Sequence, residues 1–436
     1  MQKVISFIHL SDIHFNKNSG DIYDLDKDLR NEIQRDIKKM QSESIDKIDG
    51  ILVCGDIAFS GDVIEYETAL DFLKSLCIQL GIPETSVLCV PGNHDVNHKT
   101  TKDSCIFLEV QDSIKNADDY NAKITKYSRD KENHEILYKH IDNYNTKFAS
   151  KFSCNISAEK PIWEQDFVLN DGTTLRIVGL NSVMTSNHMD HQPDGTECPM
   201  IVGEYQLPLR EENVAYVSLC HHPPNCWKDA ENNIKNKMNA IVQVQLYGHN
   251  HNQQIFQIGN NLVIGSGATH PSRLENDWIP MYNWLSFHVE ESDGKRYLKI
   301  KVFPRIFSRT NNCFIADSVN STGNTFREYT ISLNVDENGL DELNDISISK
   351  DPAIPVDNNG VLATEITIKS STKALVYRFL SLSFVDRSSI LTKFELLNEE
   401  DEGVNHVDIL HEVLERAKAF GNIKQFEEEV DRLYNS

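Results

Sequence analysis

Basic residues are scarce in this sequence, which holds 43 Lys and Arg against 66 Asp and Glu and carries a formal charge of -23. So acidic a chain argues against a broad basic surface that tracks nucleic acid, although a local basic groove is compatible with it. The nine cysteines are an odd number without paired metal-binding spacing, and Cys54, Cys89 and Cys220 lie inside apolar runs. This placement favours buried free thiols in a reducing compartment over a disulfide framework.

Long apolar runs are also missing, because no uninterrupted apolar stretch of the sequence is long enough to span a bilayer. The chain opens Met-Gln-Lys-Val-Ile and enters an apolar run at once. We therefore expect no signal peptide and a cytoplasmic location. At 436 residues the chain exceeds one ordinary core, so two or three domains are expected.

Apolar runs and amphipathic segments alternate through the first ninety residues. Residues 4–10, 50–54 and 87–90 predict buried strands, and residues 24–40 and 65–80 have the spacing of helices that cover a sheet. This alternation predicts a layered α/β fold. Further strands are predicted at 174–180, 214–220 and 240–246, and a meander that closes a second sheet at 261–267, 284–290 and 296–303, with a last strand at 326–333.

A long polar insertion, residues 99–160, breaks this rhythm and contains helical patches at 105–114 and 135–152. Its position directly after a candidate site predicts a lid or a substrate-selecting cap, and the alternative is a surface elaboration without a role in chemistry.

The composition changes again after residue 335. Residues 336–371 are rich in Asp, Asn, Gly and Pro and predict a linker with one strand at 364–368. Residues 372–436 show helical spacing and predict a separate module of four short helices, a small all-α domain.

Five loops, each directly after a predicted strand, carry side chains typical of metal sites. They are Asp12-x-His14, Gly55-Asp56, Gly92-Asn93-His94-Asp95, His221-His222 and Gly248-His249-x-His251. In an extended segment, side chains two residues apart point to the same side, so the side chains of Asp12 and His14 can approach the same position in space. Mixed carboxylate, imidazole and amide donors suit Mn, Fe, Zn or Co better than Mg or Ca. Two adjacent cations need a shared anion, and we expect Asp56 to be that bridge.

Taken in this order, the five motifs resemble the calcineurin-like metallophosphoesterase superfamily across residues 1–335. The resemblance is closest to its cyclic-nucleotide phosphodiesterase branch, although the repair-exonuclease branch shares the same five motifs. It rests on Ser11-Asp12-Ile13-His14, Pro91-Gly92-Asn93-His94-Asp95 and His221-His222-Pro223. It implies a four-layer αββα sandwich and two divalent transition-metal ions, with Mn favoured.

The resemblance also implies a ligand set and a mechanism. One ion would be held by Asp12, His14, Asp56 and His251, and the other by Asp56, Asn93, His221 and His249. His221 is favoured over His222 as the ligand. A hydroxide between the metals would attack phosphorus in line. His94, a non-ligand, would stabilise the transition state or protonate the leaving oxygen, and Asp95 would orient His94.

Four further histidines are candidates to line the site, although no motif assigns them and each is expected at the surface: His98, His188, His191 and His270. Arg273 and Arg305 are candidate phosphate clamps, again without a motif that assigns them.

Residues 379–382 and 412–420 resemble small helical adaptor domains that are appended to effectors in bacterial conflict systems. Such domains bind like domains on partner proteins, so a protein partner is expected. The alternative is a helical cap or a dimerisation element.

These patterns predict a binuclear metal-dependent phosphodiesterase that hydrolyses a cyclic nucleotide or another small diester. One alternative is a metal-dependent DNA or RNA nuclease that acts as the effector of a bacterial defence system, and another is a catalytically inactive scaffold. The acidic charge favours the small substrate, whereas the insertion and the C-terminal module favour the nuclease.

Overall fold

The computed structural model describes residues 3–334 apart from 21, 23, 25, 46, 191–197, 230–231, 272–278, 319–320 and 322, and then 375, 378–379, 382, 384–394, 396, 413, 416–417 and 423–434. The chain divides into two compact units, residues 1–336 and 337–436. The predicted linker, its strand at 364–368, His191 and Arg273 lie outside the described residues.

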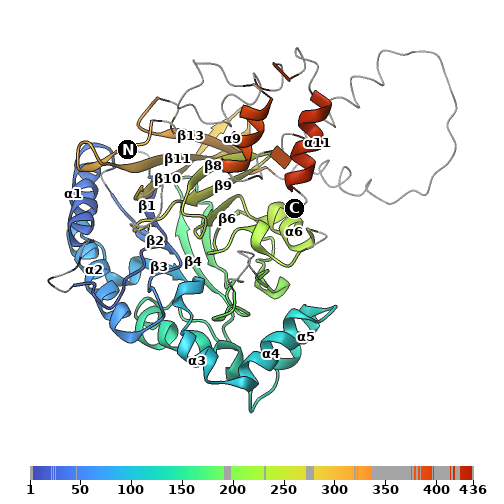
Figure 1. The fold of residues 1–436 in the computed structure, drawn as a ribbon. Helices are drawn as coiled ribbons and strands as arrows, with labels where there is room; N and C mark the ends of the chain where they lie inside the picture. Colours follow the sequence, from blue (N-terminus) through green and yellow to red (C-terminus); the bar gives the residue numbers. More distant parts are fainter. Residues whose placement is uncertain are drawn as a thin grey trace, which may run out of the picture. The chain divides into compact units, whose positions relative to one another are not determined.

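The first sheet of the larger unit has seven strands (Figure 1). The three strands nearest the N-terminus, residues 5–10, 50–54 and 87–90, run parallel and are buried at every position, which explains why their sequences are continuous apolar runs. Helices α1 (Lys27–Glu43) and α2 (Val63–Leu80) cover one face of this sheet. The strand order is β12 (Cys313–Ala316), β11 (Lys295–Ser308), β10 (Met281–Ser292), β1 (Ile5–Leu10), β2 (Gly50–Cys54) and β3 (Val87–Val90), and β13 (Arg327–Ser332) pairs with β11.

The second sheet has six strands and packs its inner face against the first. On strand β6 (Val214–Leu219), Val217 belongs to the core shared with the first sheet, whereas Tyr216 faces outward and packs with Met238 of helix α6 (Asn233–Ile241). Helices therefore cover both outer faces, as the predicted αββα sandwich requires. The order is β4 (Trp163–Val168), β5 (Thr174–Gly179), β6 (Val214–Leu219), β7 (Val244–Tyr247), β9 (Asn261–Ser266) and β8 (Gln253–Ile258).

The prediction that a meander closes the second sheet is wrong. Strand β9 does join that sheet, but β10 and β11 extend the first sheet, where Trp284 of β10 pairs with Ile8 of β1. The predicted strand at 240–246 begins too early, since α6 continues to Ile241. Edge strands β4 and β8 were not predicted, because their half-exposed sequences lack an apolar run.

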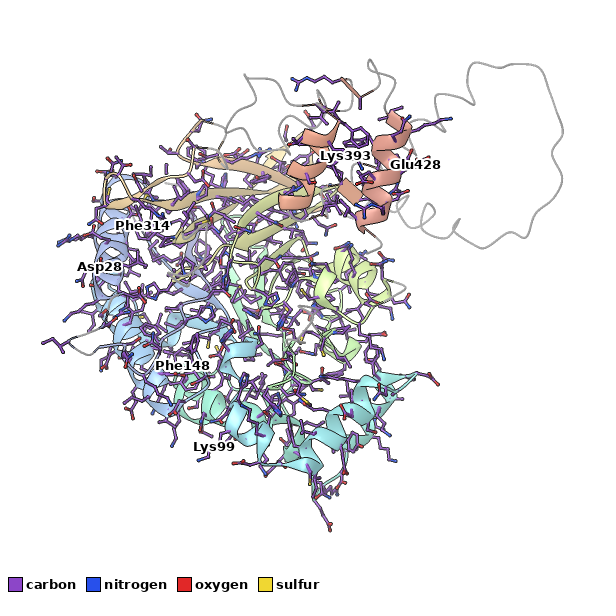
Figure 2. The ribbon with its side chains drawn as sticks, viewed as in Figure 1. Asp28, Lys99, Phe148, Phe314, Lys393 and Glu428 are labelled. Carbon is purple, nitrogen blue, oxygen red and sulfur yellow. The ribbon has the colours of Figure 1, made fainter. Side chains whose placement is uncertain are left out.

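The insertion contains helices α3 (His98–Lys102), α4 (Cys105–Lys115) and α5 (Tyr120–Ser128), and Figure 2 marks Lys99 on the first of them. The predicted helix at 135–152 is instead a series of 3-10 and π turns. Two buried side chains tie the insertion to the loop after β5. Gln111 donates hydrogen bonds to the carbonyls of Met184 and Ser186, and His140 Nε2 lies 2.7 Å from the Val183 carbonyl.

The smaller unit contains helices α9 (Phe384–Lys393) and α11 (Ile423–Tyr434), which carry Lys393 and Glu428 in Figure 2. Phe379, Val413 and Phe426 are buried in one apolar cluster, as the predicted helical spacing implies. Across both units, none of the helices that the structure describes has the length and hydropathy that a membrane crossing requires.

Candidate metal centre

The five motif loops meet where the strands of the two facing sheets end. Backbone hydrogen bonds join the loop after β1 to the loop after β2: the Asp12 amide donates to the Gly55 carbonyl, and the Ile13 amide donates to the Asp56 carbonyl. The loop after β7 is fixed in the same way, because the Gly248 amide donates to the His221 carbonyl. Two further backbone hydrogen bonds, from the amides of Thr269 and His270 to the carbonyls of Ser11 and Asp12, join segments that are 258 residues apart in the sequence.

Five residues in these loops have left-handed backbone conformations, with φ between 51° and 69°. A residue other than glycine pays roughly 1–2 kcal/mol for such a conformation, so it persists only where its surroundings enforce it. Strain of this kind gathers at functional sites. The five residues are Asp12, His14, Asp56, His249 and His251.

One group of donor atoms comes from the loops after β1 and β7. His251 Nε2 lies 3.4 Å from both Asp12 Oδ1 and His14 Nε2. The donor atoms of these three residues lie within 4.8 Å of one another, a spacing that could hold a metal ion. His14 Nε2 also lies 3.9 Å from Asp56 Oδ2.

A second group surrounds His221. Its Nε2 lies 3.1 Å from Asn93 Oδ1 and 3.3 Å from Asp56 Oδ2, and its Nδ1 lies 2.7 Å from the Cys54 carbonyl. Since a carbonyl only accepts, Nδ1 donates to it, and Nε2 is the atom that would offer its lone pair to a metal after losing its own proton. Asp56 therefore lies between the two groups of donors.

His222 is also part of this region. His221, His222 and His249 bring their ring nitrogens within 4.8 Å of one another. His222 Nδ1 is 2.8 Å from the Ser182 hydroxyl, a contact that no sequence motif indicated. His221 approaches Asp56 and Asn93 at the distances above, and the choice of His221 over His222 as the ligand stays a prediction.

The two aspartates are buried, at 0% exposure for Asp12 and 1% for Asp56. Burial would raise the pKa of Asp56, but the nearby imidazoles of His221 and His94 hold it well below its usual range. Burial would likewise lower the pKa of His221, yet the charge of Asp56 raises it to about 9. Two ionised carboxylates this deeply buried need positive charge beside them. The carboxylate, imidazole and amide donors of the two groups suit borderline divalent ions, so the residues of the site fit such metals.

Two glycines allow the loops to approach this closely. A Cβ on Gly92 would lie 2.1 Å from Asp56 Oδ1, and a Cβ on Gly248 would lie 2.0 Å from the Ser11 hydroxyl and 2.9 Å from Asp12 Oδ2. A side chain at either position would therefore displace a carboxylate of the site.

The prediction that Asp95 orients His94 is wrong. The Asp95 carboxylate is fully buried and accepts hydrogen bonds from the amides of Ile57, Ala58 and Gly92 and from the Tyr66 hydroxyl. Burial, followed by the charge of Asp56, raises the pKa of Asp95 to about 7. Asp95 thus joins the loop after β2 to the loop after β3.

The His94 ring is held by a backbone group instead. Its Nδ1 lies 2.9 Å from the Phe59 carbonyl, and its amide donates to Asp56 Oδ1 at 2.8 Å. Its ring packs edge-on against the ring of His14 at 4.7 Å between centroids. A backbone carbonyl leaves no motif in a sequence, so this partner of His94 could not be predicted.

The remaining candidates have other surroundings. His270, expected at the surface, is buried, and its Nδ1 lies 2.8 Å from the Ile13 carbonyl. Arg305, expected as a phosphate clamp, is buried and paired with Asp36, so it is not available to a substrate. His188 Nδ1 contacts the Thr101 hydroxyl at 2.9 Å.

A four-layer α/β sandwich with clustered carboxylate and imidazole donors at its strand ends defines a metal-dependent phosphoesterase. The comparisons with known proteins agree with this class. The chain belongs to the calcineurin-like phosphoesterase family, whose model matches residues 5–253. A second model, the GTPase-associated adaptor domain, matches residues 371–432, in line with the predicted adaptor-like module.

The uncharacterized metallophosphoesterase-like protein YydB of Bacillus subtilis is 31% identical over 98 residues, which are 22% of this chain and 19% of that protein. The chain thus matches about a fifth of that relative's length. Similar solved structures include a putative 5'-nucleotidase from Staphylococcus aureus (11% identity, TM-score 0.35, 79% of this chain and 58% of that one). They also include the purple acid phosphatase PPD1 from yellow lupin (12% identity, TM-score 0.38, 76% of this chain and 54% of that one).

Proposed function

We propose that this protein is a binuclear metal-dependent phosphodiesterase that hydrolyses a cyclic nucleotide or another small diester. The observation that carries the proposal is the place of Asp56. Its carboxylate lies 3.9 Å from His14 Nε2 on one side and 3.3 Å from His221 Nε2 on the other, so one anion faces both groups of donors.

In this proposal Asp12, His14, Asp56 and His251 hold one ion, and Asp56, Asn93, His221 and His249 hold the other. When bound, two divalent cations, with Mn favoured over Fe, Zn or Co, supply the charge that activates water and neutralises the phosphate. The buried carboxylates fix the positions of that charge, and the Cys54 carbonyl holds the ring of the proposed ligand His221 in one orientation.

His94 is the proposed acid. Because the Phe59 carbonyl only accepts, His94 Nδ1 carries a proton, and Nε2 is the atom that can hold or deliver a second one. A protonated ring would stabilise negative charge on the phosphate or donate its Nε2 proton to the leaving oxygen. Asp95 serves as a positioning residue, because it ties the loop that carries His94 to the loop that carries Asp56.

The insertion is the proposed wall of the substrate site. The buried contacts of Gln111 and His140 join it to residues 183–186, and in this proposal it limits by its shape which substrates can enter. Together with the formal charge of -23, this favours a small diester over a long polyanion.

The second candidate is a DNA or RNA nuclease recruited through its C-terminal module. The observation that favours it is the match of residues 371–432 to the GTPase-associated adaptor domain. In this case the module binds a protein partner, and the partner decides when the phosphodiesterase unit meets its substrate.

The test is an activity panel. Purified protein with Mn²⁺ is offered cyclic AMP and cyclic GMP in parallel with single-stranded, linear and circular DNA and with RNA, and metal content is measured on the same samples. Hydrolysis of cyclic nucleotides alone supports the first proposal, and cleavage of polynucleotide supports the second. A protein that purifies with far fewer than two metal ions and cleaves none of these substrates would be the inactive scaffold.

A further inference from the structure

The side chain of Phe59 is exposed beside the candidate metal centre. It is 53% exposed, which is unusual for a large apolar ring. Its ring lies 5.4 Å from the ring of His94 and 6.2 Å from the ring of His14, measured between centroids. An apolar surface therefore stands directly next to the proposed acid and one proposed metal ligand.

The backbone of Phe59 is fixed on both sides. Its amide donates to the Phe15 carbonyl at 2.8 Å, and its own carbonyl meets His94 Nδ1 at 2.9 Å. The next residue, Ser60, is held by the buried carboxylate of Glu65, which accepts from both its amide and its hydroxyl at 2.9 Å. The exposed ring thus stands on a rigid segment, and binding a flat partner would cost little ordering of the backbone.

From this arrangement we propose that Phe59 is a stacking platform for the nucleobase next to the scissile phosphate. The inference rests on the proposed phosphodiesterase function and narrows its substrate class to nucleoside phosphodiesters. Aromatic side chains bind bases through their faces with little sequence preference, and the half-exposed ring of Phe59 gains buried area by doing so. The base can belong to a cyclic mononucleotide or to the terminal nucleotide of a strand.

The experiment compares substrates with and without a base. The first pair is cyclic AMP and the methyl riboside 3',5'-cyclic phosphate, and the second is a single-stranded oligonucleotide and the same strand with abasic sites. The variants are Phe59→Leu, which keeps an apolar side chain without an aromatic face, and Phe59→Trp, which keeps the face. The matched control is Ile78→Ala, an exposed apolar residue on α2.

Stacking predicts that Phe59→Leu lowers the ratio of kcat/KM with base to kcat/KM without base by about five- to a hundredfold, mostly through KM. Phe59→Trp and Ile78→Ala should keep the wild-type ratio. The substrate pair that shows the effect identifies the source of the base. An unchanged ratio in Phe59→Leu overturns the inference, and so does an equal loss on both members of a pair, since that result means that Phe59 acts only through His94.

A binding measurement separates this inference from the proposed function. Calorimetry compares adenosine 5'-monophosphate with ribose 5-phosphate on the wild-type protein and on Phe59→Leu, with no turnover required. If wild-type protein hydrolyses no diester, the proposed function fails, yet a preference for the base that disappears in Phe59→Leu would still support the platform. Equal affinity for the two ligands in wild-type protein overturns it.

Discussion

The substitution Asp56→Asn is the sharpest test of the binuclear centre. In the wild-type protein the His94 amide donates to Asp56 Oδ1 at 2.8 Å, and the side-chain oxygen of asparagine can accept the same hydrogen bond. The substitution replaces Oδ2, which lies 3.3 Å from His221 Nε2, with an NH2 group that cannot bind a cation. The variant therefore removes the shared anion while it leaves the shape of the loop nearly unchanged.

The magnitude follows from this geometry. Two unit charges separated by the distance between Asp56 and His221 attract by about 5 kcal/mol at an effective dielectric constant of about 20. Losing that attraction for a bound cation should release at least one metal ion per chain. Turnover should then fall by about a thousandfold or more, as expected when a group that stabilises transition-state charge is removed.

Metal analysis, thermal melting and turnover are measured on the same preparations. A cation at a hundred times its Kd stabilises the wild-type protein by about 2.7 kcal/mol, so chelation should lower its Tm, whereas Asp56→Asn should show a smaller change. The control is Asp166→Asn, which changes an exposed carboxylate paired with Arg176 and should keep both metals. Two retained ions together with near-normal turnover in Asp56→Asn would refute the reasoning.

Four further changes test other parts of the structure. His94→Ala should reduce kcat by about 10²–10⁴-fold with both metals retained, and loss of both metals on analysis would instead make His94 a ligand. Gly92→Ala should cost about 1–3 kcal/mol in thermal melts and weaken metal binding, because its Cβ would lie 2.1 Å from a carboxylate oxygen; an unchanged melt and metal content would contradict the close approach. Asp36→Ala should destabilise the protein by about 3–5 kcal/mol in urea, because the buried guanidinium of Arg305 loses its carboxylate, and a change below about 1 kcal/mol would argue against the pair. Deletion after Ser370 should leave hydrolysis of a generic small diester intact, and a truncated chain that folds and binds metal without hydrolysing anything would count against a recruiting role of the module.

Many strands and helices could be predicted because each is encoded by a local pattern of apolar and polar residues. The buried strands at 50–54 and 87–90 were predicted at their observed bounds, since parallel strands covered on both faces are continuous apolar runs. The pairing partners of β10 and β11 were predicted wrongly, because the residue pattern of a strand does not indicate which sheet the strand joins. The long hairpin that they form pairs with β1, at a sequence separation of more than 270 residues.

Asp12 and His14 lie together as expected, although strand alternation, the reason given for this expectation, is incomplete. Asp12 and His14 were expected to face one point because residues two apart alternate along an extended strand. Both lie near Asp56 and His251 as expected, yet both have φ near 51°, outside the strand conformation. Hydrogen bonds from the Asp12 and His14 amides to the loop after β2 hold them there. Spacing in the sequence therefore indicated which side chains lie together, whereas their common direction is set by a second loop that only the folded chain brings alongside.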